Sequence, residues 1–295
     1  MKTLVLRSSI VVIGLVTSAF SNETGIKVTE IPAGLFDMGS PASEADRHPN
    51  EGPQHEVQIS KFEMGIYPTT QEQYQRVMGT NPSYFSANGG GKDEVKGLDT
   101  SQFPVENISW FDGVEFCIKA SEMDGLSPYY RMTDIVRDGG SIKSAKVTNL
   151  GRNGWRLPTE AEREYAARAG TTTPFFFGST LNGDNANIDG DYPYGTSVKG
   201  ESLERTTKVG SYSPNKFGLY DMSGNVWDWC FDVCDDKAYA NRSGTTKDPV
   251  VESGSEWRRF RGGSWYDFAM VARSAVRGGD TPGVRYNYVG FRVVR

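Results

Sequence analysis

Two segments of the chain carry the pattern of amphipathic helices with marked beginnings and ends. The first segment is PTTQEQYQRVMG at residues 68–79. The Thr70 side chain can cap the first turn, and Gln73 stands three residues later, as a capping box requires. Gly79 can adopt the left-handed conformation that ends many helices. The pattern predicts a helix that begins after Thr70 and ends at Gly79.

The second segment is WRLPTEAEREYAARAG at residues 155–170. Thr159 and Glu162 form the same capping box, and Gly170 supplies the same stop signal. Alanine and tyrosine side chains recur at helical spacing on one face, at Ala161, Tyr165, Ala166 and Ala169. The pattern predicts a second helix with an apolar face.

Segments with the alternation of strands lie between and after these helices. HEVQISKFEMG at 55–65 and VGFRVVR at 289–295 are the clearest. NGGGK at 88–92 predicts a surface loop, because its glycines favour irregular backbone. Neither an internal repeat nor a proline-rich linker divides the chain. We therefore expect one α+β domain with much irregular structure at residues 22–295.

The N-terminus differs from the rest of the chain. Lys2 and Arg7 precede an apolar run at residues 10–16, which small residues follow. This order is typical of a secretory signal peptide, predicted here at residues 1–21. A buried strand is the alternative for a run of this length. We expect no transmembrane anchor, because a membrane span needs about 20 apolar residues. Cleavage would leave an exported protein, periplasmic, at the cell surface or secreted.

Composition and charge exclude one class of partner. Glycine is abundant, at 34 of 295 residues, and indicates many tight turns. The formal net charge is −5, and the basic residues are scattered along the chain. Because binding to a phosphate backbone requires a concentrated basic surface, we expect no nucleic-acid partner.

The chain has three cysteines, Cys117, Cys230 and Cys234. An odd number leaves at least one thiol free in an exported protein. Cys117 lies in a segment that resembles a buried helix, and Cys230 and Cys234 either form a disulfide or remain free thiols. With only two histidines, at His48 and His55, neither a zinc or iron site nor a Cys–His catalytic pair has enough side chains to support it.

Six motifs follow one another along the chain in the order of a known family. They are IPAGLFDMGS, FPVENISWFDGVEFC, GWRLPTEAEREYAARAG, NKFGLYDMSGNVWDW, RGGSW and VGFR. From about Val28 to Arg295 the chain resembles the formylglycine-generating enzyme (sulfatase-modifying factor) family. The resemblance implies a modified C-type lectin-like fold, loop-rich, with small antiparallel sheets and two main helices. Arg163 departs from the tryptophan that the family usually has at this position.

The motif GLYDMSGNVWDW at residues 218–229 has the chemistry of a calcium site. Asp221 and Asp228 are carboxylates seven residues apart, and Gly224 between them lets the backbone turn. Carboxylate and carbonyl oxygens together are what Ca²⁺ prefers. The resemblance implies a calcium ion held by the Asp221 and Asp228 side chains and the Gly224 and Val226 carbonyls. Asp228 stands where the family more often has glutamate, which shortens its reach.

A second calcium site is implied by the same resemblance. Its ligands correspond to Asn187, the Ile188 carbonyl and Glu201. The alternative for Asp221 and Asp228 is that they stabilise turns without a metal. A bound ion would support a domain rich in loops, because binding to the native state alone stabilises it.

The tail at residues 261–295 lacks the chemistry of the family's enzymes. Those enzymes use two cysteines in this region to hold copper and oxidise a substrate cysteine, whereas this tail has none. The segment between Ser264 and Arg273 is also too short for their two-cysteine loop. Since Cu(I) needs soft thiolate ligands, copper is not expected as a cofactor, and no catalytic residue is assigned.

The tail instead combines a fixed frame with a second set of residues. The frame residues are Gly262, Gly263, Ser264, Ala269, Ala272, Arg273, Ala275, Arg277, Pro282, Gly290, Phe291 and Arg292. The residues between them are Tyr266, Asp267, Phe268, Val271, Val276, Gly278, Gly279, Asp280, Val284, Tyr286, Asn287 and Tyr288. Changing only the adenines of an Asn codon can give every residue of the second set.

This arrangement resembles the variable proteins of diversity-generating retroelements, such as the Treponema variable protein, which display diversified residues on the same kind of fold. The alternative is that the second set consists of ordinary loop residues. Tyrosine and phenylalanine offer contact area at low entropic cost, and Asp and Asn offer adaptable hydrogen bonds, as in antibody paratopes.

Two functions therefore compete. One is an exported protein that binds a protein or glycan ligand through its tail, and the other is an oxygen-dependent metalloenzyme for sulfatase maturation or a related small-substrate oxidation. The missing cysteine pair favours binding. The sequence does not specify the ligand or the oligomeric state.

Overall fold

The computed structural model of the protein describes residues 22–295. The predicted signal peptide, residues 1–21, lies outside the described residues. Within 22–295, no helix has both the length and the apolar character that crossing a membrane requires.

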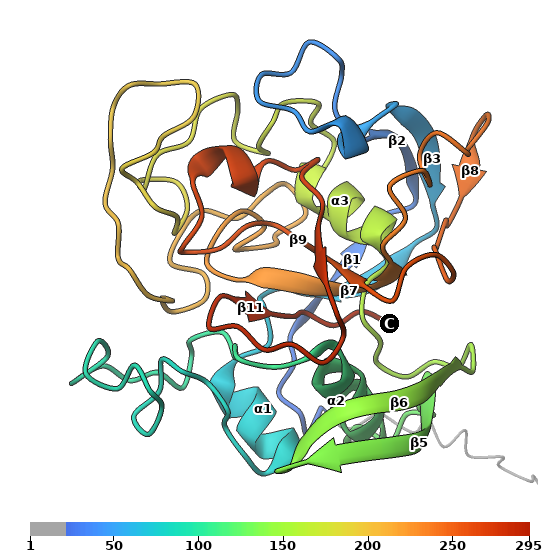
Figure 1. The fold of residues 1–295 in the computed structure, drawn as a ribbon, viewed down its shortest axis with the longest axis vertical. Helices are drawn as coiled ribbons and strands as arrows, with labels where there is room; N and C mark the ends of the chain where they lie inside the picture. Colours follow the sequence, from blue (N-terminus) through green and yellow to red (C-terminus); the bar gives the residue numbers. More distant parts are fainter. Residues whose placement is uncertain (1–21) are drawn as a thin grey trace, which may run out of the picture.

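A four-stranded sheet runs through the middle of the molecule (Figure 1). Its strands are β7 (Trp227–Val233), β9 (Arg258–Arg261), β10 (Gly278–Asp280) and β11 (Val289–Gly290), in the order β10-β9-β7-β11. β7 pairs antiparallel with β9 and parallel with the short β11. Two of the four strands, β10 and β11, lie within the tail at residues 261–295, and β9 ends at its first residue, so strand pairing fixes the tail backbone there.

Two smaller sheets come mainly from the N-terminal third. β2 (Gly34–Met38), β3 (His55–Ile59) and β8 (Thr246–Lys247) form one, and β1 (Val28–Ile31) pairs with β4 (Phe62–Gly65) in the other. The strand pattern predicted in the segment HEVQISKFEMG is confirmed, and the structure divides it into two strands, β3 and β4. β3 alternates between buried and less buried positions because one of its faces packs on the core.

Three α-helices are present in the described residues: α1 (Gln71–Met78), α2 (Trp110–Met123) and α3 (Glu160–Arg168). α1 has the predicted capping box, with the Thr70 side chain accepting from the Gln73 amide, and it ends at Gly79 with φ 77°. α2 uses Ser109 as its N-cap in the same way. The α1 prediction is therefore confirmed at both ends.

α3 begins as predicted but is buried on every side. Thr159 and Glu162 form its capping box, and Ala169, rather than Gly170, is the left-handed C-cap residue, with φ 45°. The predicted alanine and tyrosine face is buried, but so are its charged residues. Those charges form ion pairs with other elements, which offset part of the cost of burying them.

A long hairpin was not among the predicted elements. β5 (Tyr130–Asp138) and β6 (Ser141–Asn149) pair antiparallel beside α2, below the central sheet in Figure 1. The terminal segment VGFRVVR forms little regular strand, because after β11 only Val294 bridges, to Met64 and Arg156. Short 3₁₀ helices lie at Pro49–Glu51 and Ala269–Ala272.

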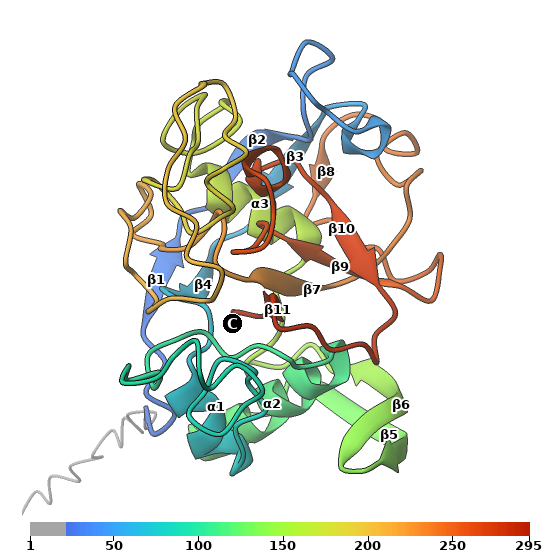
Figure 2. The ribbon, with the colours of Figure 1, turned by 60° about the vertical axis from the view of Figure 1, so that its left-hand side comes forward.

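The segment 170–226 has no helix or named strand. It forms the yellow loops on one side of the molecule in Figures 1 and 2. A small apolar cluster that includes Phe175, Ile188 and Ala272 packs these loops against the tail. The irregular segment 170–226 and the C-terminal tail therefore stabilise one another through this cluster.

A candidate recognition surface on the tail

Two buried arginine side chains fix the tail from inside the molecule. Arg273 forms two hydrogen bonds with the carboxylate of Glu51, at 2.9 and 2.8 Å. Arg277 pairs in the same two-pronged way with Glu160, at 2.7 and 2.9 Å. Such paired bonds define position and orientation together, so both arginines hold the tail in one conformation.

Glycine is required at one point of the frame. Gly263 has φ 72°, which L-residues rarely adopt, and a Cβ there would lie 2.9 Å from the Ala272 Cα. The backbone of the RGGSW motif therefore packs directly against the 3₁₀ helix that follows it.

Three tyrosines of the second set form a stacked row, hereafter the tyrosine row, which consists of Tyr266, Tyr286 and Tyr288. The rings of Tyr286 and Tyr288 lie 4.8 Å apart at 8°, and those of Tyr266 and Tyr288 lie 5.9 Å apart at 17°. Tyr266 is 65% exposed, whereas the other two are half-buried. Residues about 20 positions apart thus form one aromatic surface.

Hydrogen bonds connect the two segments that carry the row. The Trp265 indole donates to the Asn287 carbonyl at 3.0 Å, and the Tyr286 hydroxyl donates to the Asp280 carboxylate at 3.0 Å. These bonds restrict the loops that present the aromatic rings.

A loop outside the tail extends this surface. Phe268 stacks on Tyr192 with ring centroids 4.0 Å apart, and both side chains are exposed. The Asp189 amide donates to the Asp267 carbonyl, and the Ala269 amide donates to the Tyr192 carbonyl. Our sequence analysis missed Tyr192, because only the fold brings it beside the tail.

Asp267 differs from the expected surface residue. Its carboxylate accepts hydrogen bonds from the Trp227 indole at 2.8 Å and from the Ser264 hydroxyl at 2.5 Å. Burial raises the pKa of this carboxyl above its usual value. Two hydrogen bonds thus hold this side chain against the loop, and its contact with a ligand stays a prediction.

The valines of the second set are also less available than expected. Val276 is buried in the main core, which excludes it from contact with a ligand. Val271 and Val284 are half-buried and pack against the same core. The predicted ligand-binding set is therefore too broad at these apolar positions.

Gly278 and Gly279 are confined by their neighbours in the sheet. A Cβ on Gly278 would lie 2.2 Å from the ring of Phe260, and one on Gly279 would lie 2.3 Å from the Cys234 sulfur. Larger residues at these positions would displace those side chains. Packing around β10 therefore limits which residues can occupy these two positions, whether or not a ligand binds there.

The first predicted calcium site contains an ion pair that the sequence did not predict. The Asp228 Oδ2 atom accepts from the Arg163 Nε and the Arg292 Nε, each at 2.8 Å, and all three side chains are buried. Arg163 and Asp228 are both positions where the sequence differs from the pattern that the resemblance implies, and the two side chains are in direct contact.

The same arginines leave little electrostatic need for a cation between Asp221 and Asp228. Arg292 also donates to the Tyr220 and Asp221 carbonyls. Asp221 accepts from the Gly210 amide at 2.7 Å, and burial raises the pKa of its carboxyl to about 6. Ca²⁺ prefers sites with net negative charge, and two guanidinium groups beside one carboxylate do not provide it. The Asp228 Oδ1 atom nevertheless has no hydrogen-bond partner in the described residues.

The two predicted calcium sites adjoin one another. A Cβ on Gly224 would lie 2.4 Å from the Asn187 carbonyl oxygen and 3.0 Å from the Ile188 side chain. That carbonyl oxygen accepts from the Asn225 amide at 2.7 Å. Val226 is buried immediately before β7.

The second site offers a free oxygen. The Asn187 side chain is buried and donates to the Arg205 carbonyl and to the Asn225 side chain, but its Oδ1 atom has no hydrogen-bond partner in the described residues. Glu201 is exposed. Among residues 22–295, no cluster of three or more His, Cys, Asp or Glu side chains could hold a metal ion. The Asn187 side-chain oxygen, together with backbone carbonyls, therefore fits a calcium ion better than the first predicted site does. Calcium binding stays a prediction.

Comparison with known proteins identifies the family. Residues 16–295 match the sulfatase-modifying factor enzyme 1-like domain. The chain belongs to this family. It is 33% identical to the chaperone protein LppX of Paenibacillus barcinonensis, over 81% of each chain, and 26% identical to the inactive Cα-formylglycine-generating enzyme 2 of Bos taurus, over 92% of this chain and 88% of that one.

Among solved structures, the Treponema denticola variable protein 1 is similar, with a TM-score of 0.71 and 29% identity over 90% of this chain and 94% of that chain. The predicted fold class is confirmed: the chain has a loop-rich α+β fold of the formylglycine-generating enzyme and variable-protein type.

The three cysteines of this sulfatase-modifying factor domain all lie outside the tail. Cys117 and Cys230 are buried, and burial raises the pKa of both thiols far above the usual range. Cys234 is half-buried, and burial raises the pKa of its thiol to about 11. All three are free thiols in the structure, so Cys230 and Cys234 are not joined. None of them lies between Ser264 and Arg273.

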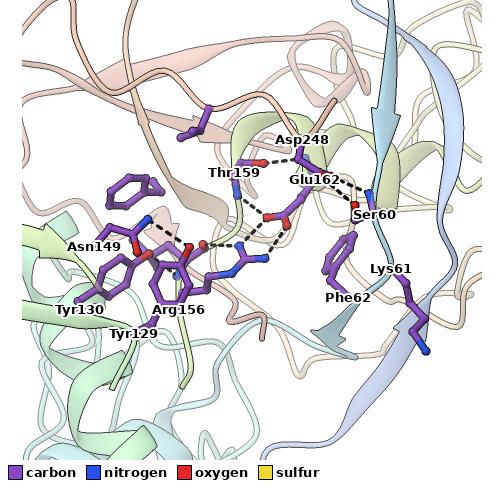
Figure 3. A pocket seen from close by; sticks show the side chains of 13 residues that line it. Ser60, Lys61, Phe62, Tyr129, Tyr130, Asn149, Arg156, Thr159, Glu162 and Asp248 are labelled. Carbon is purple, nitrogen blue, oxygen red and sulfur yellow. Dashed lines mark hydrogen bonds and ion pairs between the residues drawn. The ribbon is translucent and has the colours of Figure 1, made fainter. Parts of the chain in front are cut away.

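A cavity of about 250 Å³ lies elsewhere, between α3 and the β5–β6 hairpin (Figure 3). Glu162 holds the Arg156 guanidinium through both oxygens, at 2.7 and 2.5 Å, and the Tyr130 hydroxyl accepts from the Leu157 amide. These charges are satisfied by one another. We therefore assign this cavity a structural role.

Proposed function

We propose that this protein is an exported ligand-binding protein whose tail displays a diversified recognition surface on a lectin-like scaffold. One observation carries the proposal: the tyrosine row and Phe268 lie on a tail that buried arginine pairs hold from within. Aromatic residues on a rigid support bind with little loss of conformational entropy. The ligand is a protein or a glycan.

The surface that supports this proposal is narrower than the twelve residues predicted from the sequence. Its members are side chains that keep exposed area, although Tyr286 and Tyr288 also pack against the main core: Tyr266, Phe268, Tyr286, Asn287, Tyr288 and Tyr192. Clustered aromatic side chains surrounded by polar groups are typical of binding hot spots.

The alternative, an oxygen-dependent metalloenzyme, has less support from these residues. The copper-holding cysteines are absent from the tail, and Asp267, which stands in that region, already accepts two hydrogen bonds. Oxygen- and copper-dependent conversion of a Cys-x-Pro-x-Arg peptide to its aldehyde would favour the enzyme. We expect no conversion.

The diversification can be tested on the gene. We expect independent isolates to differ mainly in the codons for Tyr266, Phe268 and residues 286–288, while frame codons such as that for Gly263 stay constant. A near-copy of the last hundred or so bases beside a reverse-transcriptase gene is expected as well. A tail that is identical in all isolates, without such a copy, would contradict diversification.

A further inference from the structure

A cavity of about 700 Å³ lies on the other side of the tail, beside β10. β10 is an edge strand of the central sheet, as Figure 2 shows. Gly278 and Gly279 form one wall of the cavity, and the loops that contain residues 234–237 and 254–257 form the others. None of the tyrosine row lines it, so it is separate from the recognition surface.

A buried cation lines this cavity without a full set of partners. The Arg259 side chain is 4% exposed, and its Nε atom has no hydrogen-bond partner in the described residues. Its Nη2 atom donates to the Asp236 carboxylate at 2.7 Å. The Asp236 side chain is 69% exposed, which makes it a carboxylate that an incoming anion can replace.

The charges behind Arg259 also lack balance. Arg259, Arg261 and Arg277 all lie within 4.0 Å of one carboxylate, that of Glu160. Arg261 shares a second carboxylate, that of Glu164, with Arg168. Four buried arginines thus share two buried glutamates. Burial raises the pKa of the nearby Asp232 carboxyl to about 7, so this group carries less than a full negative charge at neutral pH.

The remaining walls suit a planar group attached to the anion. Trp257 is 50% exposed and lines the cavity. The two glycines of β10 expose bare backbone there, and the Asn50 Oδ1 atom is buried without a partner in the described residues. Asp235 also lines the cavity, but its carboxylate already accepts from the Lys237 amide at 2.8 Å.

We propose that this cavity binds a ligand with an anionic group, a carboxylate or a phosphate, that replaces Asp236 at Arg259 while an adjoining planar apolar part packs on Trp257. Charge-assisted bonds to a buried guanidinium supply the affinity, and the indole ring supplies a preference for planar ligands.

The test titrates the protein with four probes at constant ionic strength set by NaCl, and measures heat on mixing. The probes are acetate, benzoate, inorganic phosphate and phenyl phosphate. We expect saturable binding of at least one pair, with the aromatic member tighter. Binding of the carboxylate pair or of the phosphate pair identifies the anion, and binding of neither overturns the proposal.

Variants distinguish a built site from general charge attraction. Asp236→Asn removes the competing carboxylate from an exposed position, so it should tighten binding by about tenfold. Arg259→Gln should abolish binding, and Trp257→Ala should remove the preference for the aromatic probes. Because Arg259 is buried and its variant can misfold, the Asp236 and Trp257 variants are decisive. Affinities that do not change in these two variants would overturn the proposal.

A matched control separates this site from the recognition surface. Tyr266→Ser lies on the tyrosine row and should leave the binding of all four probes unchanged. A loss of binding in Tyr266→Ser would mean that the probes occupy the recognition surface, and the proposal would fail.

Discussion

Buried ion pairs constrain the conformation of single residues in the tail. Arg273, Arg277 and Arg292 are buried, and each meets a buried carboxylate from an earlier part of the chain. Removing one partner of such a pair leaves the other unpaired, which costs on the order of 3–5 kcal/mol. We therefore expect the frame arginines to tolerate substitution poorly.

Glu106 allows a test of burial at one residue. It is fully buried and accepts from the Tyr84 and Phe85 amides at 3.0 and 2.8 Å. Burial raises the pKa of its carboxyl from 4.5 to about 8. Between these values the folded protein keeps a proton that the unfolded chain releases. Stability must therefore fall as pH rises from about 4.5 to about 8.

We expect Glu106→Gln to reduce this fall by on the order of 1–3 kcal/mol. Urea unfolding at pH 5 and pH 8 measures it. Asp221 and Asp232 have raised pKa values and contribute in the same direction, so the comparison is between variant and parent protein. Glu94→Gln, at an exposed position, is the control. An unchanged pH dependence in Glu106→Gln would show that Glu106 is ionised in the folded protein.

Among the elements, those with local signals could be predicted from the sequence. Capping boxes at Thr70 and Thr159 involve neighbours three residues apart, so both helix N-termini can be predicted from the local sequence. The β5–β6 hairpin was missed although its turn has a signal: Gly139 and Gly140 both have positive φ. Contacts between distant segments, such as Tyr192 with Phe268, had no local signal.

The aromatic residues of the two tail segments differ in burial. Tyr266 and Phe268 are exposed, whereas Tyr286 and Tyr288 are half-buried and pack against the main core. We expect Tyr266→Ser with Phe268→Ser to change the free energy of unfolding by less than about 0.5 kcal/mol for each replacement. Tyr286→Ser with Tyr288→Ser should cost more, about 1–3 kcal/mol each, because contact with the core is lost.

Gly263→Ala is the matched change in the frame. The new Cβ would meet the Ala272 Cα at 2.9 Å in a left-handed conformation, so destabilisation by about 2 kcal/mol or more is expected. Thermal and urea unfolding of the three variants measures the order of the effects. If Tyr266→Ser with Phe268→Ser destabilised the protein as much as Gly263→Ala, these aromatic residues would belong to the core rather than to a recognition surface.

For the molecule as a whole, the six ordered motifs were enough to predict the fold class, because they carry the resemblance to a family of known fold. Accessibility was not predictable in the same way. Val276 and Gly279 look like variable surface positions in the sequence, but packing around β10 confines them. Likewise, the contact between Arg163 and Asp228 crosses 65 positions, and it changes the chemistry of the first predicted calcium site.

The stability of the whole domain should depend on calcium through the irregular segment 170–226. The Asn187 backbone carbonyl lies beside Gly224, and the Asn187 Oδ1 atom has no hydrogen-bond partner in the described residues, so an ion held by this side chain would join loops that have little regular structure. Binding to the native state alone stabilises a protein by about 2.7 kcal/mol at a hundredfold excess of ligand over Kd. We expect the melting temperature to fall when a chelator removes calcium.

Two variants identify which predicted set holds the ion. Asn187→Ala should abolish most of the difference in melting temperature with and without calcium. Asp228→Asn should lower the melting temperature equally in both conditions, because it removes the partner of Arg163 and Arg292 rather than a calcium ligand. If the rise in melting temperature with calcium were lost in Asp228→Asn but kept in Asn187→Ala, the ion would lie at the first predicted site instead. A melting temperature that the chelator leaves unchanged in the parent protein would mean that the loops are held by their hydrogen bonds alone.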